Sequence, residues 1–267
     1  MNLRGEDIEM KKVWNSFVVA FAMYSKIPMP RADWTKENMK YALCFFPWVG
    51  LAVGAMEYGW FQLAVYLGIG SMFRAAGMTV IPILVTGGIH MDGFLDTMDA
   101  LSSWKEKEQR LAILKDPHAG AFAVIMGCTY FVVYLGAASE VSEAVLPVFC
   151  LSFGISRCLS ALSLIWFRNA NPKGSAAAFA DRAQKRVVAI VLAATILVLC
   201  GGMCFLRPIP GIICSGTAVL VFFFYRFKSF KYFGGITGDL AGYFLSLCEI
   251  WMLVMAVFIQ CGMERFL

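Results

Sequence analysis

Long apolar runs alternate with short polar segments along most of this chain. A helix that crosses the hydrocarbon core of a bilayer needs about 20 mostly apolar residues. Six runs approach or exceed that length and one is shorter; they cover residues 41–67, 75–94, 120–138, 145–167, 187–206, 211–225 (the short run) and 240–263. The pattern predicts an all-α fold, a polytopic membrane helix bundle with about seven spanning helices, in a single domain over residues 1–267.

One further apolar run precedes these. Residues 13–24 are flanked by Lys11, Lys12 and Lys26. A run of about a dozen residues is too short to span, so we expect it to lie in the membrane interface or to pack as a half-helix.

Basic residues gather between alternate pairs of runs, while the other connections hold only Arg74 and Arg207, and this pattern predicts the orientation of the chain. Cytoplasmic loops of membrane proteins carry an excess of Lys and Arg. The basic stretches hold Lys26, Arg31, Lys36 and Lys40; Lys105, Lys107, Arg110 and Lys115; Arg168, Lys173, Arg182, Lys185 and Arg186; and Arg226, Lys228 and Lys231. We therefore expect these stretches and the N-terminus in the cytoplasm and the C-terminus outside.

The composition agrees with a membrane protein. Hydrophobic residues make up 60% of the chain and charged residues 15%, where a soluble protein carries about a quarter charged. The net charge of +5 is explained by the cytoplasmic stretches, so no nucleic-acid partner is expected. The nine cysteines lie mostly inside apolar runs without a CxxC pair, which is typical of small apolar core residues.

The most informative polar motif is TGGIHMDGFLDTMDAL at residues 86–101. Asp92, Asp96 and Asp99 follow one another at spacings of four and three, which puts them on one face of a helix. Three like charges at the end of an apolar run repel each other and resist leaving water. Carboxylate oxygens suit Mg2+, so the motif predicts a metal site at the membrane surface. The alternative is a solvated helix end.

The expected topology brings three other polar segments to the same face: RLAILKDPHAGAF, with Lys115, Asp116 and His118; NPKGSAAAF at residues 171–179; and KYFGGITGDLAGY, with Gly234, Gly235, Thr237, Gly238 and Asp239. We expect Asp116 and Asp239 to contribute to the metal site, and Lys115 and the glycine loop to handle phosphate, since glycines before a helix let backbone N–H groups approach one.

Each of these residues also has a structural interpretation. Asp116, followed by Pro117, fits a helix N-cap. The glycines fit a simple turn. His90 and His118 have no metal-ligand spacing and fit local hydrogen bonding. Arg157 lies near the middle of a predicted span, where a charge is costly. It is predicted either to form an internal ion pair with Glu57 or Glu249 or to reach a phosphate or the aspartates.

Several motifs in order resemble one family. YSKIPMPR, FPWVGLAVGA, TGGIHMDGFLDTMDAL, LKDPHAGAF, ISRCLSAL and GGITGD resemble the elements of the cobalamin synthases, the adenosylcobinamide-GDP ribazoletransferases. The third motif resembles the family signature GG-x-H-x-DG-x-x-DT-x-D, which is long and specific. The resemblance covers most of the chain.

The resemblance implies an enzyme of the bacterial cytoplasmic (inner) membrane that uses Mg2+. It joins adenosylcobinamide-GDP to α-ribazole or α-ribazole 5′-phosphate: a ribose hydroxyl attacks the phosphorus next to the cobinamide, GMP leaves, and adenosylcobalamin or its 5′-phosphate forms. The catalytic candidates are Asp92, Asp96, Asp99 and Asp116, and the metal candidates are these four and Asp239. The substrate-binding candidates are His90, Lys115, His118, Arg157, Gly234, Gly235, Thr237 and Gly238. The expected partners are the two substrates, the lipid bilayer, and either other corrinoid-pathway enzymes or a second copy of the chain.

Two other functions stay open. A phosphotransferase of the CDP-alcohol type also clusters aspartates on helices, but its DG-x-x-AR signature is absent because FLDT follows Asp92 and Gly93. A transporter would use Glu57, Arg157 and Glu249 as an ion path. Transporters place their sites near the midplane, often between repeats, whereas here the polar motifs gather at one face.

Overall fold

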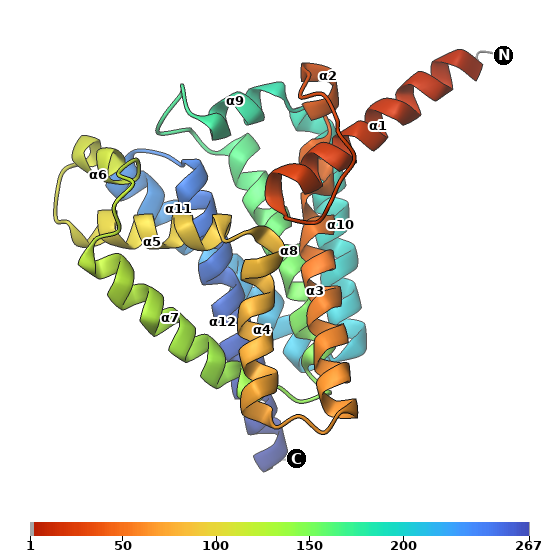
Figure 1. Ribbon diagram of the computed structural model, residues 1–267, viewed down its shortest axis with the longest axis vertical. Helices are drawn as coiled ribbons and strands as arrows, with labels where there is room; N and C mark the ends of the chain where they lie inside the picture. Colours follow the sequence, from red (N-terminus) through yellow and green to blue (C-terminus); the bar gives the residue numbers. More distant parts are fainter. Residues whose placement is uncertain (1–2, 267) are drawn as a thin grey trace.

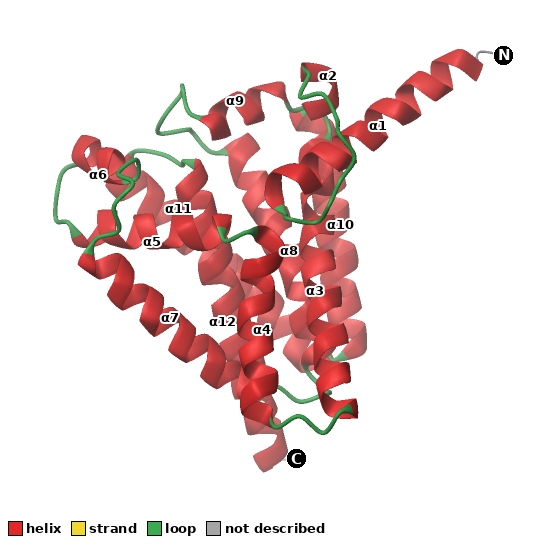
Figure 2. Ribbon diagram, in the orientation of Figure 1, coloured by secondary structure: helices red, strands yellow, loops and turns green. Residues whose placement is uncertain are grey.

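The chain folds into a bundle of α-helices. A computed structural model describes residues 3–266 of the 267. Within that range all regular structure is helical, and one isolated parallel bridge joins Asn169 and Ile236 (Figure 2). The predicted fold class, an all-α membrane bundle, is confirmed.

Six helices are long and apolar enough to cross a membrane. They are α3 (Ala42–Tyr66), α7 (Ala121–Ser139), α8 (Leu146–Trp166), α10 (Lys185–Leu206), α11 (Pro208–Phe233) and α12 (Gly238–Phe266). Helix α8 is buried along nearly its whole length, with α3, α10 and α12 packed around it. The predicted spans at these places are confirmed, although α11 is longer than the run at residues 211–225.

The span expected over residues 75–94 is wrong as a single straight helix. The chain forms α4 (Ser71–Thr86) and α5 (Ile89–Ser102), and α5 turns away from α4 by 97°. The turn is made by Gly87 and Gly88, whose φ angles of 67° and 79° lie in the left-handed region that favours glycine. Helix α5 therefore runs across the bundle, and α4 and α7 leave its two ends and approach each other away from it (Figure 1). The pair counts as a seventh span only if both helices are taken as one broken span.

The N-terminal element is longer than the run at residues 13–24. Helix α1 (Leu3–Tyr24) has 22 residues and is not among the candidate spans found in residues 3–266. Its second half packs against α3 and buries Val18, Val19 and Ala20, as expected for a half-helix. Its first half extends away from the bundle (Figure 1).

Three short helices complete the fold: α2 (Lys36–Met39), α6 (Lys107–Ile113) and α9 (Ser175–Arg182). All three lie at the same end of the bundle as α1 and α5, and the C-terminus lies at the opposite end (Figure 1). The basic stretches that the sequence assigns to one face are thus gathered at one end of the molecule.

Candidate active site between α5 and α12

The α5–α12 crossing positions the carboxylates because glycines let the two helices touch. A Cβ atom added to Gly93 on α5 would lie 2.5 Å from the backbone oxygen of Asp239. One added to Gly242 on α12 would lie 3.1 Å from the carbonyl oxygen of His90. No side chain fits between the backbones at Gly93, so Asp92 and Asp239 are held close to each other at the start of both helices.

Asp96 is at the centre of the acidic cluster. Its carboxyl is partly withdrawn from water and lies in the field of four other carboxylates, in decreasing strength Asp92, Asp239, Asp99 and Asp116. The structure therefore brings together aspartates from α5, the α6–α7 connection and α12. Such a concentration of negative charge attracts cations and repels an unaccompanied phosphate.

Asp99 has a structural task. Its carboxylate accepts hydrogen bonds from the backbone N–H groups of Gly120, at 2.5 Å, and Ala123, at 2.8 Å, in the first turn of α7. Gly120 permits this approach, since a Cβ there would lie 2.7 Å from the carboxylate oxygens. Asp99 is thus the N-terminal cap of α7, supplied from a neighbouring helix.

The helix-cap interpretation of Asp116 is wrong, because α7 begins at Ala121, five residues later. Asp116 instead accepts hydrogen bonds from His118, from the backbone N–H at 3.0 Å and the ring Nδ1 at 2.8 Å. These two hydrogen bonds lower the pKa of Asp116, the backbone one more strongly. Both side chains are exposed to solvent at the edge of the cluster.

The fit of a metal ion depends on which carboxylates remain available. Across residues 3–266, no three His, Cys, Asp or Glu side chains are arranged to hold a metal ion by themselves. Asp99 is oriented by backbone amides of α7 and Asp116 by His118, whereas Asp92 and Asp239 line the aromatic cavity and Asp96 lies in the field of both. Mg2+ is commonly held by one or two carboxylates together with water and substrate phosphates, and Asp92, Asp96 and Asp239 fit that kind of site.

The glycine loop closes the site from the other side. Helix α11 ends at Gly234, which adopts the left-handed conformation with φ 77°. Ile236 then pairs with the strand-like segment after α8, donating to the oxygen of Arg168 at 2.9 Å and accepting from Ala170 at 2.8 Å. Gly235 is needed here, since a Cβ would collide with that segment. The Thr237 hydroxyl accepts from the N–H of Leu240 at 3.2 Å and caps α12.

Two cavities meet at Asp239. The first, here the polar cavity, has a volume of about 430 Å³ and is lined in part by Lys115, Asn169, Asn171 and Thr237. The second, here the aromatic cavity, has a volume of about 230 Å³ and is lined in part by Tyr24, Phe46, Phe179, His90 and Asp92. Ala176, Gly238 and Asp239 line both. Asp239 therefore stands at the border between a polar and a largely apolar compartment.

Comparison with known proteins identifies the family. A model of the cobalamin-5-phosphate synthase family matches residues 16–257. The chain belongs to this family. It is 44% identical over 248 residues to an adenosylcobinamide-GDP ribazoletransferase of Lachnoclostridium phytofermentans, covering 93% of this chain and 95% of the relative. It is 32% identical over 246 residues to one of Clostridium botulinum strain Alaska E43, covering 90% and 96%. No solved structure matches the chain.

Family membership confirms the resemblance seen in the motifs. All the candidate site residues lie inside the matched segment, since His90 is the first and Asp239 the last. The structure adds what the motifs do not contain, namely how four segments from different parts of the chain pack around Asp96 and Asp239.

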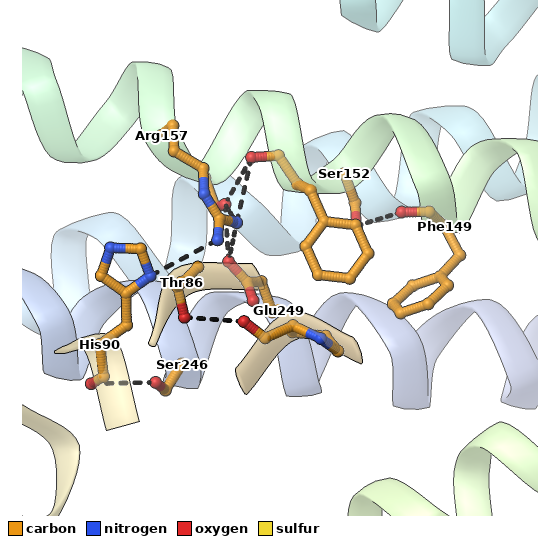
Figure 3. A network of polar contacts seen from close by, with 10 residues as sticks. Thr86, His90, Phe149, Ser152, Arg157, Ser246 and Glu249 are labelled. Carbon is orange, nitrogen blue, oxygen red and sulfur yellow. Dashed lines mark hydrogen bonds and ion pairs between the residues drawn. The ribbon is translucent and has the colours of Figure 1, made fainter. Parts of the chain in front are cut away.

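Arg157 is engaged in an ion pair with Glu249 inside the bundle (Figure 3). The Arg157 side chain is 0% exposed; the Ser156 hydroxyl lies 3.0 Å from its Nη1 and 3.1 Å from the Glu249 carboxylate. Its Nη2 lies 3.5 Å from the Nδ1 of His90. The structure shows the ion-pair alternative, and contact with a phosphate would require breaking that pair. Glu57 is also fully buried.

Sequence reasoning missed two groups of lining residues. Asn169 and Asn171 line the polar cavity, and the run NPKGS after a basic residue was the available signal. Tyr24, Phe46 and Phe179 line the aromatic cavity. Each of them belongs to a motif quoted above, since Tyr24 begins YSKIPMPR, Phe46 begins FPWVGLAVGA and Phe179 ends NPKGSAAAF. Their spacing within apolar stretches is that of ordinary core residues, so the motifs alone did not single them out as cavity walls.

Proposed function

We propose that this protein is an adenosylcobinamide-GDP ribazoletransferase, which joins adenosylcobinamide-GDP to α-ribazole or its 5′-phosphate and releases GMP. The relatives that bear this name belong to the same family as this chain, and they match it over nearly the whole length of both proteins. The observation that supports it best is the position of Asp239. A carboxylate at the junction of two cavities, beside Asp92 and Asp96, suits a reaction that joins two substrates.

The reaction makes clear demands on these residues. The oxygen of a ribose hydroxyl bonds to the phosphorus next to the cobinamide, the bond from that phosphorus to the GMP oxygen breaks, and the hydroxyl proton passes to a base. Asp239 lies at the border of the cavities and Asp92 lines the aromatic cavity, so one of these carboxylates accepts that proton. Lys115 in the polar cavity offers a positive charge to the departing phosphate. Holding both substrates in line at this border is the main contribution of the fold.

Mg2+ is part of this proposal. Asp92, Asp96 and Asp239 are the carboxylates that would hold it, since their negative charges crowd together. When bound, the ion neutralises negative charge on the phosphate oxygens. The start of α12 at Gly238 adds a positive helix end beside the same cavities.

The orientation in the membrane is also proposed. The N-terminus, α2, α6, α9 and the acidic cluster belong to one end of the bundle, and the basic stretches belong to the same end (Figure 1). By the positive-inside rule this end faces the cytoplasm of the bacterial inner membrane and the C-terminus lies outside. The nucleotide-activated substrate would then meet the active site from the cytoplasm.

A GMP-release assay on purified protein in nanodiscs tests the function. We expect release to require α-ribazole and Mg2+ and to stop when the ion is chelated and resume when it is restored. Lys115→Ala is expected to raise KM for adenosylcobinamide-GDP more than KM for α-ribazole. Accumulation of the corrinoid inside proteoliposomes without GMP release would instead identify a transporter.

Cysteine labelling tests the orientation. In a background without the exposed Cys128 and Cys261, single cysteines replace Lys105 and Glu143, which are exposed at opposite ends of the bundle. We expect a membrane-impermeant maleimide to label Glu143→Cys in cells whose outer barrier has been permeabilised, and Lys105→Cys only after the inner membrane is opened. The reverse pattern would invert the proposed topology.

A further inference from the structure

We propose that the aromatic cavity is the site for the base of α-ribazole, with the ribose directed toward Asp92 and Asp239. The ligand class is a riboside of a flat, bicyclic aromatic base. This inference rests on the proposed function and assigns one of its two substrates to one of the two cavities.

The walls of the cavity suit a flat aromatic ring. Tyr24 and Phe46 lie with ring centroids 4.1 Å apart and planes inclined by 36°. Phe179 meets Tyr24 edge-on at 6.2 Å, and His90 meets Phe46 edge-on at 6.0 Å. The four rings come from α1, α3, α5 and α9, and each contacts the next, so they form a continuous aromatic lining in the order Phe179, Tyr24, Phe46 and His90. Aromatic faces and edges bind a flat heterocycle through stacking and edge contacts.

The chemistry of the cavity changes along its length. Apolar side chains such as Phe46, Leu164 and Leu245 line it, together with two carboxylates: Asp92, and Asp239, which also lines the polar cavity. A riboside has the same division, with an apolar base at one end and hydroxyl groups at the other. With the base among the rings, the ribose reaches the carboxylates, where a hydroxyl must lose its proton.

Size separates the two substrates. The aromatic cavity has about 230 Å³, below the roughly 300–1,000 Å³ typical of sites for drug-sized ligands, so it admits one ring system and excludes a corrinoid. The polar cavity is larger, at about 430 Å³, and carries Lys115 and two asparagines. That set suits the phosphate groups of the nucleotide-activated substrate, and the polar cavity has no aromatic lining residue on which the base of α-ribazole could stack.

A matched pair of substitutions on α3 tests the assignment. Phe46 and Phe61 are both buried, with 1% and 2% exposure, and lie about 22 Å apart along one helix at about 1.5 Å per residue. Phe46→Leu removes a stacking face, worth about 1–3 kcal/mol per base, so KM for α-ribazole is expected to rise at least about fivefold. Phe61→Leu makes the same change in side chain away from the cavity and is expected to leave that KM within about twofold.

The second substrate and a second variant complete the kinetic test. KM for adenosylcobinamide-GDP is expected to stay within about twofold in both α3 variants. Phe179→Leu changes a ring of the cavity that belongs to α9, and it is expected to raise KM for α-ribazole as Phe46→Leu does. Agreement between the two variants would show that the effect does not come from a local distortion of α3. Equal changes in both KM values, or equal effects of Phe46→Leu and Phe61→Leu, would overturn the assignment.

Direct binding separates this inference from the proposed function. Equilibrium dialysis measures the binding of labelled α-ribazole to wild-type and variant protein in nanodiscs, without the second substrate. We expect α-ribazole to bind more weakly to Phe46→Leu than to the wild type, and to bind Phe61→Leu as it binds the wild type. Binding with this pattern but no GMP release would retain the site and refute the transferase. Turnover by the wild-type protein with unchanged α-ribazole binding in Phe46→Leu would retain the transferase and refute the site.

Discussion

Gly93→Ala tests whether the α5–α12 crossing positions the carboxylates. Gly93 lies next to Asp92 in sequence and against the backbone of Asp239 in space. The substitution adds a single methyl group at the point where the two helices touch and changes no charge. Any loss of activity would therefore come from the separation of the helices.

The magnitude follows from the geometry. The new Cβ would lie 2.5 Å from the backbone oxygen of Asp239, whereas ordinary contact begins at 3.4 Å, so the helices must separate by about 0.9 Å. A misplacement of about 1 Å in a reacting site costs about 10²-fold in rate. Overpacking costs about 1–3 kcal/mol of stability, of which up to about 1 kcal/mol is offset by the better helix propensity of alanine. We expect kcat to fall about a hundredfold in a protein that still folds.

The assay is steady-state GMP release, with thermal unfolding measured on the same preparation. Gly59→Ala on α3 is the control, because a Cβ there meets no atom within 4 Å. It is expected to keep the wild-type rate and to match or exceed wild-type stability. A wild-type kcat in folded Gly93→Ala protein would refute the claim that the contact between α5 and α12 at Gly93 positions the carboxylates of the site.

Three further predictions concern single side chains. Asp96→Asn keeps the size of the residue and removes its charge, so we expect GMP release to slow by about 10²–10³-fold; a near wild-type rate in limiting Mg2+ would show that Asp96 is not needed. Asp99→Ala removes the cap of α7 and should cost about 1 kcal/mol in thermal unfolding, whereas Asp99→Asn, which has a single acceptor oxygen, should keep one of the two hydrogen bonds to α7 and cost less; a large change in the Mg2+ requirement of Asp99→Asn would show that Asp99 holds the ion instead. Arg157→Gln leaves Glu249 buried without its partner and should lower stability by about 3–5 kcal/mol, and replacing both with apolar residues should restore most of it; activity lost at wild-type stability would point to a direct role for Arg157.

Periodicity and charge predicted the bundle well because a spanning helix must satisfy its backbone hydrogen bonds within itself. The runs that became α3, α7, α8, α10 and α12 have the expected bounds within a few residues. The bend at Gly87 and Gly88 was missed, because an apolar run reads the same whether it continues straight or turns. Two consecutive glycines before a helix were the available signal for the turn.

The sequence was enough to predict which residues belong to the site, but not which role each of them has. Asp92, Asp96 and Asp99 share a spacing, yet Asp99 caps α7 because Gly120 leaves room for its carboxylate. Asp239 gains its central position from a helix crossing at Gly93 that no local pattern encodes. Contacts between distant segments decide these roles, so they require the folded structure.

The most direct test of the account is the product balance of the purified protein. With adenosylcobinamide-GDP, α-ribazole and Mg2+, the account predicts that adenosylcobalamin and GMP form in equal amounts, measured by mass spectrometry, and that neither forms when α-ribazole is left out. GMP release that proceeds equally without α-ribazole would identify a hydrolase, and the absence of both products from folded protein would contradict the proposed transfer.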